Sequence, residues 1–448
     1  MNTETILVNG LILADPACPE VVPHGKTIIN GNGLIQVNVP NDAGLPWDNV
    51  IDCSNCLIMP GLVNAHTHAA MSLLRGIADD LPLDQWLNRY IFPSEAKHAG
   101  PEFVYLGTCL SAMEMALNGV TTFADGYFHM ENAAQAALDV GLRAVVAQGI
   151  LDVPTPDTSV PGSWRKRADT FLAGCPTDSL ITCALFCHSP YLCSAETLQA
   201  ALTLSLEHGI LLFCHVSETA REVEEIQRQH GVRPVEYLRR LGILGRDFVA
   251  VHAVHVSDAE QEMLAESGTG IVHCPESNMK LASGAAPVQD LLAKGITIAI
   301  GTDGPASNNN LDLFEEMRSA SFLAKLITGD PQALDARTVL RMATIDGARV
   351  LGMEDRIGSL EPGKLADLTV INLNRPHLTP LYDPISHLAY AARGTDVQHV
   401  MVNGRWVVRD GRIKTIDEDS LMARARGVAA NIGKDLGITT YGDLVTNE

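Results

Sequence analysis

Residues 60–68 read Pro-Gly-Leu-Val-Asn-Ala-His-Thr-His, an apolar run that ends in two histidines, His66 and His68, one residue apart. On a β-strand, side chains at positions i and i+2 leave the same face, so two such imidazoles can converge on one metal ion. A His-x-His pair is, on its own, equally compatible with two polar residues at the end of a strand. The residues that follow along the chain favour the metal site.

Four further short apolar runs end in a residue that can bind a metal or move a proton. These residues are His188, His215, His252 and Asp303. A continuous run of Val, Ile, Leu, Ala and Cys is typical of a strand that is buried on both faces of a parallel sheet. Each of these polar residues is therefore expected where a buried strand ends.

Amphipathic segments of helix length separate these runs, at residues 195–208, 217–241, 258–266 and 288–294. Strands that alternate with helices predict a (β/α) barrel, whose strands all end at one shared mouth. Histidines that are far apart in sequence can meet at that mouth, which an open doubly wound sheet allows less easily. The predicted fold class is therefore α/β, with a TIM-like barrel that carries the site.

Both ends of the chain contain short apolar segments with turn signals, at residues 6–13 and 25–35 and again at 366–371 and 400–408. A strand pair from either end alone would be marginally stable. We therefore predict that the two ends pair into one small composite β-sandwich beside the barrel. Two independent β-appendages are the alternative.

The predicted division of the chain has three parts. Residues 1–57 form the N-terminal part of the β-sandwich, residues 58–364 the barrel, and residues 365–448 the C-terminal part of the sandwich. A helix predicted over residues 420–436 closes the chain. The chain of 448 residues can hold one barrel of roughly 250 to 300 residues together with this accessory unit.

The composition indicates a well-packed globular protein, with 46% hydrophobic and 19% charged residues. The formal net charge of −21 argues against a nucleic-acid partner, because phosphate backbones are bound by basic surfaces. The N-terminus lacks a signal peptide and no apolar run reaches about 18 residues, so we expect a cytoplasmic protein outside the membrane. The expected partner is a neutral or zwitterionic small molecule, and a homo-oligomer is compatible with the sequence.

Four of the ten cysteines lie inside apolar runs: Cys183, Cys187, Cys214 and Cys274. We expect these to be small buried side chains in a reducing compartment. A further Cys-x-x-Cys at residues 53–56 has no second pair or nearby histidine to complete a zinc knuckle, so we expect Cys53 and Cys56 to pack in the core.

Five motifs, in order along nearly the whole chain, resemble the amidohydrolase superfamily. They are the stretch at 60–68, His-Val-Ser-Glu at 215–218, His-Cys-Pro-Glu-Ser-Asn-Met-Lys-Leu at 273–281, Gly-Thr-Asp-Gly-Pro-Ala-Ser-Asn-Asn at 301–309 and Glu-Pro-Gly-Lys-Leu-Ala-Asp at 361–367. More narrowly, they resemble the 5′-methylthioadenosine/S-adenosylhomocysteine deaminases, which are related to guanine deaminases and triazine hydrolases. The resemblance implies a distorted (β/α)8 barrel with a composite β-sandwich, in agreement with the pattern described above.

The resemblance implies that His66, His68, His215 and Asp303 hold one zinc ion per subunit. Three neutral imidazoles and one carboxylate suit zinc, and iron(II) accepts the same ligands. Asp303 would also contact the substrate, take a proton from the attacking water and pass it to the leaving ammonia. The strand end at 183–191 offers no lysine that could be carbamylated to bridge two metals, which favours one metal ion.

The resemblance assigns Glu218 to binding the substrate and protonating its ring nitrogen, whereas a solvated glutamate at a helix start is the alternative. His252 and His255 compete for the role of holding the attacking water, and the resemblance selects His252. His188 resembles a histidine that contacts the substrate. Glu95 matches a carboxylate that accepts hydrogen bonds from ribose hydroxyls.

The predicted function is zinc-dependent hydrolytic deamination of an adenine nucleoside, with release of ammonia. The substrate would be 5′-methylthioadenosine, S-adenosylhomocysteine or adenosine, and the catalytic residues Glu218, His252 and Asp303. A guanine or 8-oxoguanine deaminase or a triazine hydrolase would keep the metal chemistry, but Glu95 together with Glu218 favours a nucleoside. A catalytically silent structural protein would be expected to lose ligands, yet the full set is present.

Overall fold

The computed structural model describes residues 4–18, 20–40, 49–160, 162–176, 178 and 180–441. Within them, eight parallel strands form one sheet in which neighbours along the chain are neighbours in space. The strands are β6 (Leu62–Thr67), β7 (Val120–Tyr127), β8 (Arg143–Ile150), β9 (Ile181–Cys187), β10 (Leu212–Val216), β11 (Phe248–His252), β12 (Gly270–His273) and β13 (Ile298–Ile300). A bridge between Thr67 and Asp303 joins the first strand to the end of the last and closes the predicted barrel.

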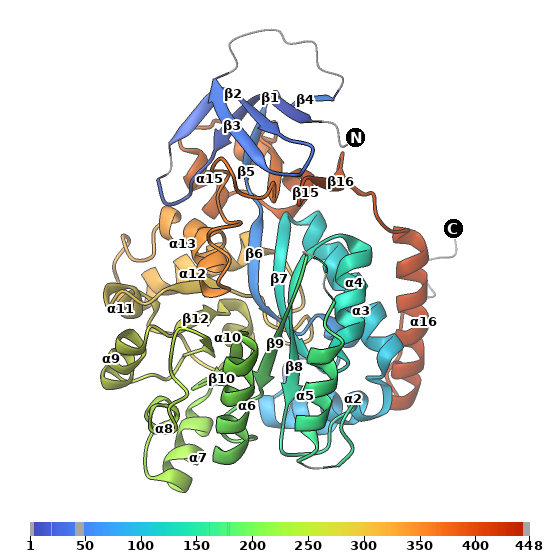
Figure 1. Cartoon of the computed structure of the whole chain (residues 1–448), viewed down its shortest axis with the longest axis vertical. Helices are drawn as coiled ribbons and strands as arrows, with labels where there is room; N and C mark the ends of the chain where they lie inside the picture. The colour runs from blue at the N-terminus through green and yellow to red at the C-terminus, as the bar shows by residue number, and fades with distance from the viewer. Residues whose placement is uncertain are drawn as a thin grey trace.

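Helices surround this barrel (Figure 1). They include α3 (Pro101–Leu117), α4 (Met130–Val140), α5 (Trp164–Ala173), α6 (Ala195–His208), α7 (Ala220–His230), α8 (Pro234–Arg240), α9 (Asp258–Ser267), α10 (Pro275–Lys280), α11 (Val288–Ala293), α12 (Leu313–Thr328), α13 (Ala336–Met342) and α14 (Ile345–Val350). The prediction at 195–208 is confirmed by α6. The prediction of one helix over 217–241 is wrong, because Gly231 ends α7 in a left-handed conformation and Pro234 begins α8.

The alternation of side chains along the strands aims the polar residues at the mouth. On β10, Phe213 belongs to the cluster that fills the barrel interior, whereas Cys214 packs in the cluster between the strands and the helices. His215 therefore faces inward, two residues after Phe213 on the same face of the strand. The same alternation places His188 above Phe186 on β9.

The two ends of the chain meet in a second sheet, as predicted, so the alternative of independent appendages is wrong. This sheet runs in the order β17-β16-β15-β14-β5-β1-β2-β3, with β4 on the side of β1. Its strands are β1 (Thr5–Leu13), β2 (Val21–Ile29), β3 (Ile35–Pro40), β4 (Val50–Asp52), β5 (Cys56–Pro60), β14 (Leu368–Asn372), β15 (Val397–Val402), β16 (Arg405–Arg409) and β17 (Arg412–Ile413). Early and late residues join directly where Ile58 on β5 pairs with Val370 on β14.

The chain passes from one sheet to the other at Gly61, between β5 and β6. A side chain is excluded at this point, since a Cβ on Gly61 would lie 2.1 Å from the side chain of Thr121. The division at residues 57 and 364 stays a prediction.

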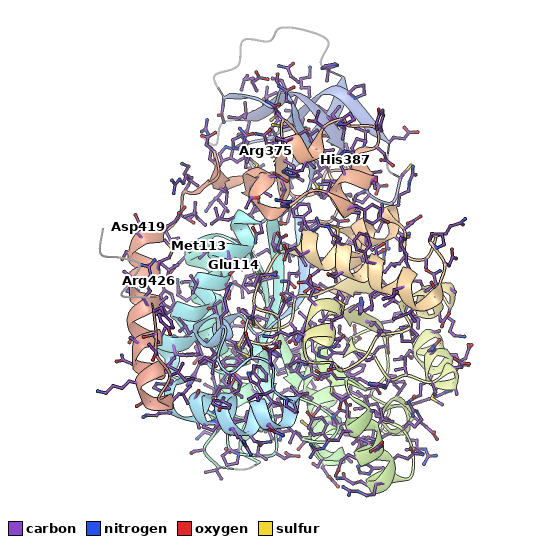
Figure 2. The ribbon with its side chains drawn as sticks, turned by 180° about the vertical axis from the view of Figure 1, so that it is seen from behind. Met113, Glu114, Arg375, His387, Asp419 and Arg426 are labelled. Carbon is purple, nitrogen blue, oxygen red and sulfur yellow. A yellow bond between two sulfur atoms is a disulfide. The ribbon has the colours of Figure 1, made fainter. Side chains whose placement is uncertain are left out.

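The helix predicted at 420–436 is α16 (Glu418–Leu436), which runs outside the barrel beside α3 (Figures 1 and 2). Asp435 near its end accepts from Lys97 Nζ at 2.7 Å and pairs with His98 Nε2 at 3.0 Å. Lys97 and His98 end α2 (Phe92–His98), the helix that also carries Glu95. The closing helix thus contacts an element that contributes to the predicted site.

Among the helices that the structure describes, none is long and apolar enough to cross a membrane.

A buried ion pair joins the barrel to the terminal sheet. Arg143, at the start of β8, donates to both carboxylate oxygens of Asp367, at Nε–Oδ2 2.9 Å and Nη2–Oδ1 3.1 Å. Asp367 also accepts from the backbone N–H of Asn403 at 2.7 Å. Arg143 and Asp367 are only 1% and 2% exposed, so neither charge has water to replace its partner.

Replacing Arg143 with alanine should therefore lower the free energy of unfolding by about 3–5 kcal/mol, because the buried charge of Asp367 would lose the partner that donates to both of its oxygens. Urea denaturation followed by circular dichroism measures this loss. The matched control is Arg165→Ala, which removes an exposed pair with Asp169 and should cost about 0–1 kcal/mol. Equal losses in the two variants would contradict the prediction.

The cysteine predictions are confirmed in part. Cys53 and Cys56 are buried in the core of the terminal sheet, and Cys187, Cys214 and Cys274 are buried free thiols. The prediction for Cys183 is wrong in one respect, because it forms a disulfide with Cys175. An apolar run indicates that a cysteine is buried but not which other cysteine lies opposite.

Candidate active site

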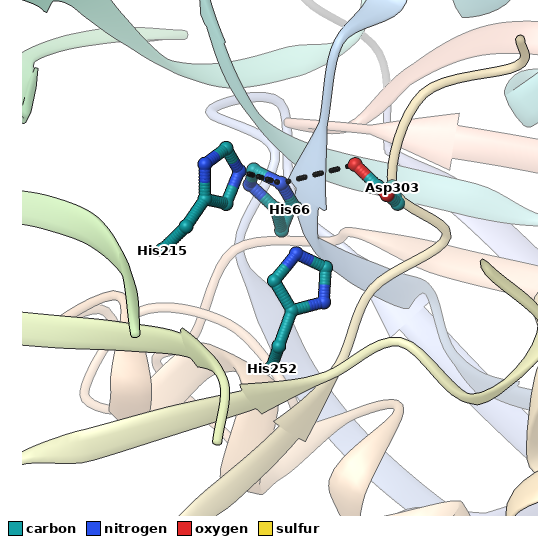
Figure 3. Close-up of side chains that lie close together, drawn as sticks. All are labelled: His66, His215, His252 and Asp303. Atoms are coloured by element: carbon teal, nitrogen blue, oxygen red, sulfur yellow. Dashed lines mark hydrogen bonds and ion pairs between the residues drawn. The ribbon is translucent and has the colours of Figure 1, made fainter. Parts of the chain in front are cut away.

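Four side chains from separate strands converge at the mouth of the barrel (Figure 3). They are His66 from β6, His215 from β10, His252 from β11 and Asp303 after β13, and their ligand atoms all lie within 4.8 Å of one another. All four residues are buried. The predicted meeting of distant polar residues at one point is thus present in the fold.

The distances within this cluster suit a shared cation. Asp303 Oδ1 lies 3.3 Å from His66 Nε2 and 3.3 Å from His68 Nε2. His215 Nε2 lies 3.3 Å from His66 Nε2 (Figure 3). The compact group thus contains His66, His215, His252 and Asp303. His68 lies next to this group and contacts Asp303.

Hydrogen bonds at the opposite ring nitrogens distinguish His68 from His252. His68 Nδ1 donates to the carbonyl of Gly126 at 2.6 Å, which leaves a lone pair on Nε2. The amide nitrogen of Asn278 faces His252 Nδ1 at 3.2 Å, which leaves the proton of a neutral ring on Nε2. In this arrangement His68 can bind a metal through its Nε2, whereas His252 can donate a hydrogen bond from its own Nε2.

Burial sets the charge states of the cluster. It lowers the pKa of His66 to about 4 and that of His252 to about 4, so both rings are neutral at pH 7. Burial alone would raise the pKa of Asp303, but its hydrogen bond with His66 and the surrounding histidines keep that pKa well below the ordinary value. Neutral imidazoles and an ionised carboxylate are the forms that bind a metal.

The second oxygen of Asp303 is held by two serines that the sequence argument did not assign. Ser277 Oγ donates to Oδ2 at 2.6 Å and Ser307 Oγ donates to it at 2.9 Å. Both serines lie inside the motifs quoted above, at 273–281 and 301–309. The two serines therefore hold Oδ2, while Oδ1 of the same carboxylate faces His66 and His68.

Glu218 lies beside the cluster, not on a solvated helix face. Its side chain is 14% exposed, and Oε2 lies 3.8 Å from His252 Nε2. Burial, together with the nearby charge of Asp303, raises the pKa of Glu218 to about 8. A carboxyl group in this state carries a proton at pH 7 and can act as an acid.

The strand ends that carry these groups have unusual backbone conformations. His252 has φ of 76°, Asp303 of 61° and Ser217, just before Glu218, of 54°. Non-glycine residues rarely adopt the left-handed region, and such residues concentrate at functional sites. At each of these three residues the backbone changes direction, at the point where the side chains of the site enter the mouth of the barrel.

The remaining predicted histidines lie at different places. The ring centre of His188 lies 5.0 Å from that of His215, and burial lowers the pKa of His188 to about 3. His255, by contrast, places Nε2 2.6 Å from the carbonyl of Ser283, outside the compact group.

Glu95 reaches the site from α2 and has a partner that the sequence argument missed. Tyr127, the last residue of β7, donates its hydroxyl to Glu95 Oε1 at 2.6 Å. The ring of Tyr127 lies 6.5 Å from that of His68, which connects Glu95 to the metal-binding cluster. Burial raises the pKa of Glu95 to about 7. Tyr127 ends a buried strand, and that position was the available signal.

The donor set fits one divalent metal. Three imidazole nitrogens and one carboxylate oxygen match the ligands preferred by zinc, and iron(II) uses similar sets. The residues that would hold it are His66, His215 and Asp303 with His68, whose Nε2 lies 3.3 Å from Asp303 Oδ1.

The model of the amidohydrolase family matches residues 57–407. The chain belongs to this family and is a hydrolytic enzyme, as the motifs predicted. A 5-methylthioadenosine/S-adenosylhomocysteine deaminase from Syntrophobacter fumaroxidans is 45% identical, over 96% of this chain and 99% of its own length. A 5′-deoxyadenosine deaminase from Methanothermobacter thermautotrophicus is 44% identical, over 96% of this chain and 100% of its own.

Among solved structures, an adenosine deaminase from Xanthomonas campestris with bound zinc superimposes with a TM-score of 0.93 at 38% identity. The match covers 96% of this chain and 98% of that one. The distorted barrel and the narrower resemblance to nucleoside deaminases are thus confirmed.

Proposed function

We propose that the protein is a zinc-dependent deaminase of adenine nucleosides, with one zinc ion per subunit. It would replace the 6-amino group of 5′-methylthioadenosine, S-adenosylhomocysteine or adenosine by oxygen from water and release ammonia. The observation that carries this proposal is the position of Glu218, whose Oε2 lies 3.8 Å from His252 Nε2, beside the buried cluster of histidines and Asp303. The names of the relatives support an adenine nucleoside as substrate.

Zinc held by His66, His68, His215 and Asp303 would supply activation of a water molecule near neutral pH. In the proposal, Asp303 accepts a proton from the attacking water and later delivers it to the departing amine. His252 holds the same water through its Nε2–H, which the contact of Nδ1 with Asn278 leaves available.

Glu218 is the proposed acid. Attack of water at C6 of the purine moves electrons onto the adjacent ring nitrogen, which requires a proton. The raised pKa of Glu218, about 8, supports this role because the group is protonated before the substrate is attacked. When ammonia leaves, the C6 hydroxyl loses its proton as the 6-oxo group forms, and this proton restores the acid form of Glu218. The products are a 6-oxopurine nucleoside and ammonia, so the atoms of one water molecule are fully used.

Glu95 and His188 are the proposed contacts to the rest of the nucleoside. Glu95 is 8% exposed, and its Oε1 accepts from the hydroxyl of Tyr127. Ribose hydroxyls would donate to its carboxylate. The relatives act on nucleosides with different 5′ groups by name, which supports recognition through the ribose and purine.

The direct test is to incubate the zinc-loaded protein with 5′-methylthioadenosine, S-adenosylhomocysteine, adenosine and guanine. Ammonia release and the ultraviolet change from adenine to hypoxanthine measure turnover. We expect turnover of the adenine nucleosides and none of guanine. Ammonia from guanine alone, or no reaction with metal bound, would refute the proposal.

Replacing Glu95 with glutamine should lower kcat/KM for adenosine about 10- to 100-fold, because the amide nitrogen that replaces one oxygen cannot accept a hydrogen bond from a ribose hydroxyl. The variant should change kcat/KM for 2′,3′-dideoxyadenosine little, since that substrate lacks the hydroxyls. Glu102→Gln, at an exposed position on α3, is the control. An equal loss with both substrates would show that Glu95 does not bind the ribose.

A further inference from the structure

Glu222 is a buried carboxylate on α7 that binds the backbone just before this helix. It is 5% exposed, and its two oxygens accept from the backbone N–H groups of Ser217 at 2.7 Å and Glu218 at 2.8 Å. Its own N–H donates to Thr219 Oγ1 at 3.1 Å, which caps α7. Glu222 thus closes the turn between β10 and α7 from one side.

The carbonyl side of the same turn is held by the next strand end. Val216 O accepts from Ala253 N–H at 3.1 Å, and Ser217 O accepts from His255 N–H at 2.9 Å. Ala253 directly follows His252, and both residues have a positive φ, 48° and 76°. The turn that carries Glu218 and the turn that carries His252 are therefore bound to each other.

We infer that Glu222 is a positioning residue, which aims the side chain of Glu218 at the substrate by fixing the backbone of residues 217 and 218. This inference rests on the proposed function, in which Glu218 is the acid. Ser217 has a left-handed backbone, so its turn needs partners to hold it. The two side-chain oxygens of Glu222 accept from both N–H groups at once.

Substitution by glutamine tests the geometry with little change in shape. The amide oxygen can accept from one N–H group, but the amide nitrogen would face the other as a second donor. The turn would then shift, and Glu218 with it. A displacement of about 1 Å at a reacting group can cost about 100-fold in rate.

The experiment compares wild type, Glu222→Gln, Glu218→Gln and the double variant, all zinc-loaded, with adenosine as substrate. Glu222→Gln should lower kcat about 10- to 100-fold, with KM within about threefold of wild type. The bound zinc should be unchanged. In the double variant, Glu222→Gln should cost less than about threefold beyond Glu218→Gln, because both changes act through one group. If Glu222→Gln does not fold, Glu222→Asp replaces it.

Asp396→Asn is the matched control. Asp396 is also buried and accepts from a backbone N–H, that of Arg393 at 3.0 Å, but it lies next to β15 in the terminal sheet. It should lower Tm and leave kcat unchanged. The inference would be overturned if Glu222→Gln kept the wild-type kcat or lost zinc. It would also be overturned if the fold-losses in kcat of the two single variants multiplied in the double variant. Absence of turnover in wild type would instead refute the proposed function.

Discussion

Replacing Asp303 with asparagine should lower turnover of adenosine by about 10⁴-fold, the largest effect that we expect from one side chain. The neutral amide is a weaker metal ligand than a carboxylate and cannot accept a proton from water. Oδ1 is the oxygen next to the other proposed ligands, since it lies 3.3 Å from both His66 Nε2 and His68 Nε2. Steady-state kinetics with excess zinc, together with metal analysis of the dialysed protein, measure the two effects.

Asp396→Asn is a suitable control for this variant too, since it makes the same chemical change at another buried carboxylate. Circular dichroism should show that both variants are folded. Ser277→Ala and Ser307→Ala should give smaller losses of rate, because each removes one hydrogen bond from Oδ2 and leaves the other. An Asp303→Asn variant with substantial turnover would remove Asp303 from the proposed mechanism.

Replacing Glu218 with glutamine should lower kcat by about 10²- to 10⁴-fold while zinc remains bound, because glutamine cannot deliver a proton. The pH dependence gives a second measurement. Burial raises the pKa of Glu218 to about 8, so the acid form predominates below this value and is lost above it. Wild-type kcat should therefore fall as pH rises through about 8, and this fall should be absent in Glu218→Gln.

Glu225→Gln provides the comparison for Glu218→Gln. Glu225 lies on α7 close in sequence, but it pairs with Arg228 on the surface. The variant should retain wild-type kcat and its alkaline fall. If Glu218→Gln kept the same alkaline limb as wild type, another group would be responsible for it and Glu218 would not be the acid.

The barrel and the cluster could be predicted because both depend on local patterns. An apolar run followed by a histidine indicates a buried strand that ends at the mouth, and His215 and His252 occupy such positions. The break at Gly231 between α7 and α8 could also have been found, since glycine and then proline are ordinary helix boundaries.

Other features depend on contacts across loops, which a linear pattern does not contain. Ser277 on α10 and Ser307 in the loop after β13 reach one carboxylate oxygen from two different segments. The distinct protonation of His68 and His252 follows from partners on neighbouring elements. The pairing of Cys183 requires the path of the chain around β9. Sequence patterns therefore predicted the residues at the site better than the hydrogen bonds among them.

The central position of β5 in the terminal sheet has a consequence for synthesis of the chain. One edge of β5 pairs with β1, whereas the other pairs with β14, whose residues 368–372 are translated only after the whole barrel. Until then the late-pairing edge of β5 is an open template on a nascent chain, and such edges recruit other strands. The sheet that joins the two ends is thus completed only after the barrel has been translated, and stalled or truncated translation products would expose an aggregation-prone edge.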